Sequence, residues 1–152
     1  MIKPEYIICH HSLTKDSGTV SWQAIRRYHM ETLGWDDIGY HFGIEFIGRN
    51  GRKAKVLRQD HYEILTGRML DQKGAHCKQN SMNHKSIGIC FVGNFDLYKP
   101  PHEMWILALK LVRSLTKVFN IPRKNVRGHH EFASYKTCPG LSFNMGKFRD
   151  QL

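Results

Sequence analysis

The sequence lacks any long apolar run. No stretch approaches the roughly 18 consecutive apolar residues that a membrane-spanning helix requires. The segment 1–8 also lacks the apolar centre of about 7–15 residues that marks a secretory signal peptide. These two absences predict a chain that is made and folded in the cytoplasm and has no membrane span.

Cysteine is scarce and dispersed. The chain has four cysteines, at Cys9, Cys77, Cys90 and Cys138, and no Cys-x-x-Cys pair. This spacing excludes a structural zinc finger and disfavours a disulfide framework. We therefore expect free thiols or a metal ligand.

Acidic residues are few compared with basic ones. The 152 residues include 13 Asp and Glu against 23 Lys and Arg, which gives a formal net charge of +10. Such an excess predicts a polyanionic partner, which could be a nucleic acid, an anionic membrane surface or an acidic polymer. No signature of a nucleic-acid-binding fold is present, so we expect no specific nucleic-acid partner.

Glycine and proline are scattered, and neither repeats nor linkers interrupt the chain. With 41% hydrophobic residues, the composition predicts one domain over residues 1–152. Apolar runs predict strands at 5–10, 40–47 and 86–92 and a short one near 125–127. Helical periodicity predicts helices from Trp22, capped by Ser21, to Gly34, at 102–119, and a weak one at the C-terminus. The fold class is α/β, with a central mixed sheet flanked by helices.

Two of these elements carry more detailed predictions. An Asn50-Gly51 pair after the second strand indicates a hairpin turn. On the first helix, Trp22, Ile25, His29 and Leu33 share one face. In the long helix the predicted core stripe is Met104, Leu107, Ala108, Leu111, Leu115 and Val118, and Lys110, Arg113 and Lys117 form another face that is most simply solvated.

Histidines and a cysteine follow two predicted strands. His10 and His11 close the first strand, His129 and His130 follow a later one, and Cys138 lies in the loop after them. Neighbouring strand residues point to opposite faces, so one histidine of each pair is the candidate ligand. Two imidazoles and a thiolate suit zinc and leave a fourth position for water, as in catalytic sites. The alternative is an inert buried cysteine with polar surface histidines, which spacing does not exclude.

A set of segments then occurs in an order that resembles one family. They are Ile8-Cys9-His10-His11-Ser12, Ile25-Arg26-Arg27-Tyr28-His29, Gly34-Trp35-Asp36-Asp37-Ile38-Gly39-Tyr40-His41-Phe42, Gly74-Ala75-His76, Asn83-His84-Lys85-Ser86-Ile87-Gly88-Ile89, Val92-Gly93, Gly128-His129-His130-Glu131 and Lys136-Thr137-Cys138-Pro139-Gly140. The chain resembles the zinc-dependent N-acetylmuramoyl-L-alanine amidases, a group that includes phage amidase-type lysozymes and peptidoglycan recognition proteins. The resemblance extends from Tyr6 to about Phe148.

This resemblance implies one zinc ion held by His10, His129 and Cys138. His11 and His130 would then lie behind the ligands or face solvent. Glu131 would either support a ligand or have a plain surface or helix-capping role.

The resemblance also implies cleavage of the amide bond between N-acetylmuramic acid and the L-alanine of peptidoglycan. Tyr40 would accept a proton, and Lys136 would stabilise the developing oxyanion. An unperturbed tyrosine is a poor base at neutral pH, so Tyr40 needs the zinc or Lys136 nearby. His76 and Asn83 would line the cleft and bind substrate; the alternative is that each orders its own loop.

Two departures from the family pattern stand out. The segment 52–66 is longer and more basic than usual, and would extend the hairpin or form a rim of the cleft. Met69-Leu70 replaces a Gly-Trp pair of many recognition proteins, which leaves the preferred stem peptide open.

The biological setting has alternatives. We expect a monomeric phage or prophage endolysin that reaches the cell wall through a membrane pore. The positive charge of the protein would attract it to the anionic wall. A non-catalytic peptidoglycan-binding module is disfavoured because Tyr40, Lys136 and all three ligands are present. An intracellular amidase that recycles muropeptides is a further possibility.

Overall fold

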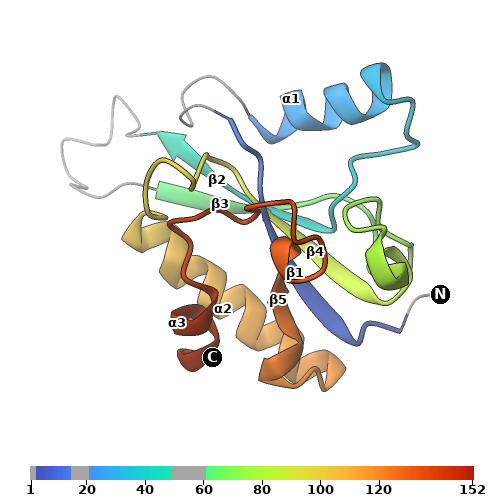
Figure 1. Ribbon diagram of the computed structural model, residues 1–152. Helices are drawn as coiled ribbons and strands as arrows, with labels where there is room; N and C mark the ends of the chain where they lie inside the picture. The colour runs from blue at the N-terminus through green and yellow to red at the C-terminus, as the bar shows by residue number, and fades with distance from the viewer. Residues whose placement is uncertain (1–2, 15–20, 49–60) are drawn as a thin grey trace.

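The computed structural model describes residues 3–14, 21–48 and 61–152. Its centre is a five-stranded mixed sheet with the order β3-β2-β4-β1-β5 (Figure 1). The strands are β1 (Tyr6–His11), β2 (Phe42–Gly48), β3 (His61–Thr66), β4 (Ser86–Phe91) and β5 (Val126–Gly128). β1 pairs in parallel with both β4 and β5, and β2 joins β4 in parallel and β3 in antiparallel orientation. The predicted fold class is confirmed.

Helices cover both faces of this sheet. Figure 1 shows α2 (His102–Phe119) and α3 (Met145–Asp150) on one side and α1 (Trp22–Arg27) on the other. α1 continues as a π-helical turn, Tyr28–Thr32, and Ser21 caps it by accepting a hydrogen bond from the Ala24 N–H (3.3 Å). Short 3₁₀ turns lie at Gln79–His84, Arg123–Asn125 and His129–Glu131. None of the helices in the described ranges is both long and apolar enough to cross a membrane.

The main core lies between the sheet and α2. Alternate residues of β1 and β4, including Ile7, Ile87 and Phe91, face α2 and are completely buried. This alternation follows from the two-residue repeat of a strand, which sends every second side chain to the same face. β4 is buried along its whole length, as its continuous apolar run predicts.

The buried side of α2 differs in part from the predicted stripe. Met104, Ala108 and Leu115 are buried as expected, but so are Leu109 and Val112. Leu107 and Leu111 are only partly buried, and Val118 is 71% exposed. The packed stripe thus lies further around the helix than predicted, because several apolar stripes fit the same sequence and the sheet contacts one of them. On the first helix, Leu33 is likewise exposed, unlike Trp22, Ile25 and His29.

Strand ends also differ slightly from the predictions. β1 continues through His11, which is aligned with Phe91 of β4, and β2 begins at Phe42, two residues after Tyr40. The residues at 61–66 form β3 and pair with β2, so this part of the longer basic segment extends the hairpin. The turn predicted at Asn50-Gly51 and the basic residues at 52–58 fall outside the described residues.

Candidate active site

The carboxyl ends of β1 and β5 bring the first two candidate ligands together. These strands are parallel, with Cys9 aligned to Gly128, so the residue that follows Cys9 in β1 and the residue that follows Gly128 lie at the same end of the sheet. His10 lies one residue beyond Cys9, and His129 follows Gly128 at the start of a 3₁₀ turn. Their ring centroids are 4.7 Å apart.

Cys138 completes a compact cluster with these two histidines. One ligand atom each from His10, His129 and Cys138 lies within 4.8 Å of the others, and all three residues are buried. Nδ1 of His10 is 3.6 Å from Sγ of Cys138. The three residues that the sequence nominates as ligands are therefore neighbours in the fold.

The protonation states in this cluster follow from its burial. Burial, together with His76 and His129, lowers the pKa of His10 well below 6.5. Burial and the positive charge of Lys136 lower the pKa of His129 to about 4. Both imidazoles are therefore neutral at pH 7 and keep a lone pair for a metal. Burial raises the pKa of Cys138 to about 12, although the His11 N–H and Lys136 oppose it.

This donor set fits a metal ion. Borderline-soft divalent metals prefer imidazole and thiolate ligands. The cluster offers two neutral imidazoles and a thiol that a cation would convert to thiolate. A metal ion at this position would supply the positive charge that a buried thiolate needs. The cluster can thus hold a metal, with one ligand fewer than a closed tetrahedral site.

The second histidine of each pair supports the cluster from behind. The backbone N–H of His130 donates to the carbonyl oxygen of Cys138 (2.8 Å), and Nδ1 of His130 contacts the same oxygen (3.0 Å). His11 is buried on the opposite face, where its Nδ1 accepts from the Phe95 N–H (3.2 Å), and its own N–H points to Sγ of Cys138 (3.4 Å). The expectation that His11 could face solvent is therefore wrong, because the loop around Phe95 covers it.

Glu131 ties this loop to α3. Its carboxylate accepts from the Gly128 N–H (2.7 Å) and pairs with Arg127 and Arg149, each at 2.9 Å. Burial alone would raise the pKa of Glu131, but these hydrogen bonds outweigh it and lower the pKa. Of the two predicted roles, the capping of the turn after β5 is the one seen.

Tyr40 lies beside His10 of this cluster. Its ring centroid is 5.1 Å from that of His10, and its hydroxyl interacts with Cys90 on β4. Burial, reinforced by Cys90 and Cys138, raises the pKa of Tyr40 well above 10. Without a metal, Tyr40 is therefore a neutral phenol.

Lys136 is exposed on the loop that leads to Cys138. Its Nζ lies 5.7 Å from the ring centroid of Tyr135, and its charge lowers the pKa of His129 and His10. The lysine thus acts electrostatically on the cluster from an exposed position.

His76 and Asn83 lie on the loop that precedes β4. Nδ1 of His76 is 3.0 Å from Nε2 of His10, and His76 is 8% exposed. Oδ1 of Asn83 accepts from the N–H groups of His76 (2.8 Å) and Cys77 (2.7 Å), so Asn83 orders its loop. Asn83 also lines an open cavity of about 300 Å³ with Trp35 and Arg68.

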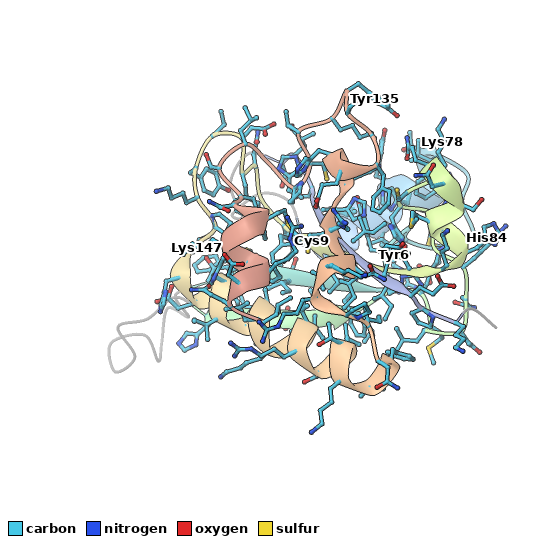
Figure 2. The ribbon with its side chains drawn as sticks, turned by 60° about the horizontal axis from the view of Figure 1, so that its bottom comes forward. Tyr6, Cys9, Lys78, His84, Tyr135 and Lys147 are labelled. Atoms are coloured by element: carbon cyan, nitrogen blue, oxygen red, sulfur yellow. The ribbon has the colours of Figure 1, made fainter. Side chains whose placement is uncertain are left out.

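Gln79 is a contact that sequence reasoning missed. Its Oε1 is 3.4 Å from Nε2 of His129, and its Nε2 donates to the hydroxyl of Tyr135 (2.9 Å). Tyr135 lies at the outer edge of the molecule (Figure 2). Gln79 therefore joins the two loops around the cluster. A single glutamine without a recurring spacing carries no signal that could have revealed this.

Three protein donors with a fourth position left open are typical of catalytic zinc sites, and metal ions in such sites assist hydrolysis. Residues 1–141 match the family described as N-acetylmuramoyl-L-alanine amidase, and the chain belongs to that family of enzymes. It is 36% identical over 141 residues to the endolysin of Escherichia phage T7, covering 89% of this chain and 80% of the endolysin.

Solved structures agree with this assignment. The N-acetylmuramoyl-L-alanine amidase LysC from Clostridium intestinale superimposes with a TM-score of 0.77 at 25% identity, covering 99% of this chain and 85% of LysC. A mutant of Drosophila PGRP-LB in complex with tracheal cytotoxin superimposes with a TM-score of 0.70 at 28% identity, covering 94% of this chain and 79% of PGRP-LB.

Proposed function

We propose that this amidase is zinc-dependent and that His10, His129 and Cys138 hold the ion. Its substrate would be the amide bond between N-acetylmuramic acid and L-alanine in peptidoglycan. The observation that carries the proposal is the convergence of three buried donor atoms within 4.8 Å. Held by these residues, zinc would supply a Lewis acid and would lower the pKa of a water molecule toward about 7.

Tyr40 is the proposed proton acceptor. The ring of Tyr40 lies beside that of His10, and Cys138 is among the groups that influence its pKa, which supports this role. Burial opposes its ionisation, so proton transfer to Tyr40 requires a positive charge at the metal position and the nearby Lys136. The phenol also donates a hydrogen bond in its neutral form, which allows it to orient a polar group of the substrate.

Lys136 is the proposed oxyanion-stabilising cation. As the carbonyl carbon becomes tetrahedral, negative charge develops on its oxygen, and a cation near that oxygen lowers the barrier. Lys136 precedes Cys138 by two residues and its charge already acts on both histidine ligands. Its exposure lets the side chain approach a bound substrate.

Peptidoglycan is the proposed partner, with Asn83, which lines the open cavity, as a proposed contact at the cleft. The formal charge of +10 would add a non-specific attraction to an anionic wall, which rising salt should weaken. The likeness to the T7 endolysin supports a role in lysis, in which a membrane pore would release the enzyme to the wall.

The test is product analysis by mass spectrometry after digestion of purified peptidoglycan. Stem peptides with a free L-alanine amino group are expected, with activity lost on chelation and restored by zinc. Intact substrate in the presence of stoichiometric zinc would contradict the proposal. Tyr40→Phe and Lys136→Ala should each keep zinc and lose most hydrolysis, and a fully active variant would remove that residue from the mechanism.

A further inference from the structure

His10 is contacted at both of its ring nitrogens. Nδ1 lies 3.6 Å from Sγ of Cys138, on the side of the ligand cluster. Nε2 lies 3.0 Å from Nδ1 of His76, on the side away from it. The two rings are nearly perpendicular, at 82°, so an N–H in the plane of one ring can point at the lone pair of the other.

The fold leaves room for His76 at this position. Gly88 of β4 lies beneath the ring, and a Cβ atom there would come within 2.5 Å of its Cδ2. Asn83 accepts from the backbone N–H of His76 and so fixes the start of its side chain. The edge of the His41 ring lies against it, with centroids 5.7 Å apart. The imidazole of His76 therefore has a defined orientation that the surrounding residues impose.

This geometry determines which nitrogen of His10 is available to a metal. A neutral imidazole carries one proton, and the nitrogen that bears it cannot bind a metal ion. If Nδ1 faces the metal, the proton resides on Nε2, and Nδ1 of His76 is placed to accept it. Without an acceptor there, the Nε2–H of the buried His10 would lose its hydrogen bond, and the tautomer with the proton on Nδ1 would gain population.

We propose that His76 is a positioning residue, which accepts the Nε2–H of His10 and so presents Nδ1 of His10 to the metal. This inference rests on the proposed zinc site. It differs from the family-based expectation that His76 binds substrate, because 8% exposure leaves little of its surface for a ligand. Outer partners of metal-binding histidines generally strengthen metal affinity about 10- to 100-fold.

The first measurement is the zinc dissociation constant, determined by competition with a chelator. His76→Ala should weaken zinc binding by about 10- to 100-fold. His76→Asn should recover much of this loss, since its side-chain oxygen can occupy the place of Nδ1. His29→Asn is the matched control: His29 is equally buried and accepts from the Gly39 N–H (3.1 Å). It contacts none of the ligands in the described residues, so its loss should leave zinc affinity unchanged.

Two further readouts separate positioning from substrate contact. Nitrogen-15 NMR of the His10 ring should show its proton on Nε2 in the zinc-loaded wild type, and a mixture of tautomers in metal-free His76→Ala. At saturating zinc, the KM of His76→Ala should equal that of the wild type. Unchanged zinc affinity with a raised KM would overturn the inference in favour of substrate binding. A wild-type protein that binds no zinc would instead overturn the proposed function, and this inference with it.

Discussion

The two faces of the central sheet are built from the same strands but carry different kinds of side chain. On the face toward α2, alternate residues such as Ile7 and Ile89 form a continuous apolar core. On the other face lie His10 and two glycines, Gly43 under the Trp22 ring and Gly88 under His76. This second face also packs apolar residues, including Ile8 and Cys90, but its glycines leave space for large rings.

The two faces contribute differently to the folding free energy and to the candidate active site. Burial of apolar side chains between sheet and helix supplies most of the folding free energy. The opposite face brings imidazoles, a thiol and a phenol together in the cluster that could hold a metal ion. We therefore expect substitutions on the face toward α2 to change the free energy of unfolding. Substitutions on the opposite face should instead change metal affinity.

The largest effect should come from the pair at the end of β1. His10→Ala removes a proposed ligand and should weaken zinc binding by more than the roughly 100-fold that follows loss of an outer partner. His11→Ala removes the acceptor of the Phe95 N–H and should destabilise the fold by about 1–3 kcal/mol. Its zinc affinity should stay near wild type, because only its backbone N–H contacts Cys138.

Chelator competition and urea unfolding of the metal-free proteins measure the two quantities. If His11→Ala lost zinc as completely as His10→Ala, the division between the faces would fail at this strand.

Second in size is a deletion in the apolar core. Phe148 on α3 is fully buried against Phe91, Phe143 and Trp105. Phe148→Ala should lower the free energy of unfolding by about 3–5 kcal/mol. Zinc affinity of the folded fraction should not change. Leu97→Ala is the matched apolar control at an exposed position, and should stay within about 0.5 kcal/mol of wild type.

A parallel change in zinc affinity and stability in Phe148→Ala would show that the two faces are mechanically coupled. Denaturant titrations followed by circular dichroism, with and without zinc, distinguish the cases.

Local sequence patterns predicted the apolar face better than the polar one. β4 and α2 follow from an apolar run and a helical repeat, each of which is contained in a few consecutive residues. The choice between His10 and His11 did not follow from spacing, since both close the same strand; only the resemblance to a family selected His10. Its selection agrees with the cluster that the fold assembles.

Contacts between residues far apart in the chain could not be predicted from the sequence. His76 meets His10 across 66 positions and Gln79 meets His129 across 50, and neither contact repeats at a period. The rotation of α2 about its axis, which decides which of its apolar residues are buried, could not be predicted either. The helix carries more apolar residues than one stripe needs. Which stripe becomes buried depends on the shape of the sheet beneath it, and that shape arises only when the strands have paired.

Glu131 connects the two faces of the sheet. Its substitution should have an effect of intermediate size on the free energy of unfolding. It joins the turn that carries His129 to Arg149 on α3. Glu131→Gln should lower the free energy of unfolding at pH 7 by about 2 kcal/mol, since hydrogen bonds to charged groups are worth about 1.5–3 kcal/mol. Glu31→Gln, at an exposed carboxylate, is the control and should change it by less than about 0.5 kcal/mol.

The pH dependence of this difference has a defined sign. The folded-state pKa of Glu131 is lowered, so its contribution is fully present above the unfolded-state pKa of about 4.3 and is lost as pH falls toward the folded value. Wild type and Glu131→Gln should therefore converge on acidification. A constant difference from pH 7 to pH 3 would exclude the carboxylate charge as its cause.

The smallest expected effect lies on the outer surface of α2, away from both faces of the sheet. Val118 belongs to an apolar stripe on the sequence but is 71% exposed, whereas Val112 is completely buried against the sheet. Val118→Ala should change the free energy of unfolding by less than about 0.5 kcal/mol. Val112→Ala should lower it by about 2 kcal/mol, from roughly 0.8 kcal/mol per buried methylene plus the cavity left behind. Equal losses in urea titrations of the two variants would mean that Val118 is covered in solution, and that the packed stripe of α2 is the one predicted from its sequence.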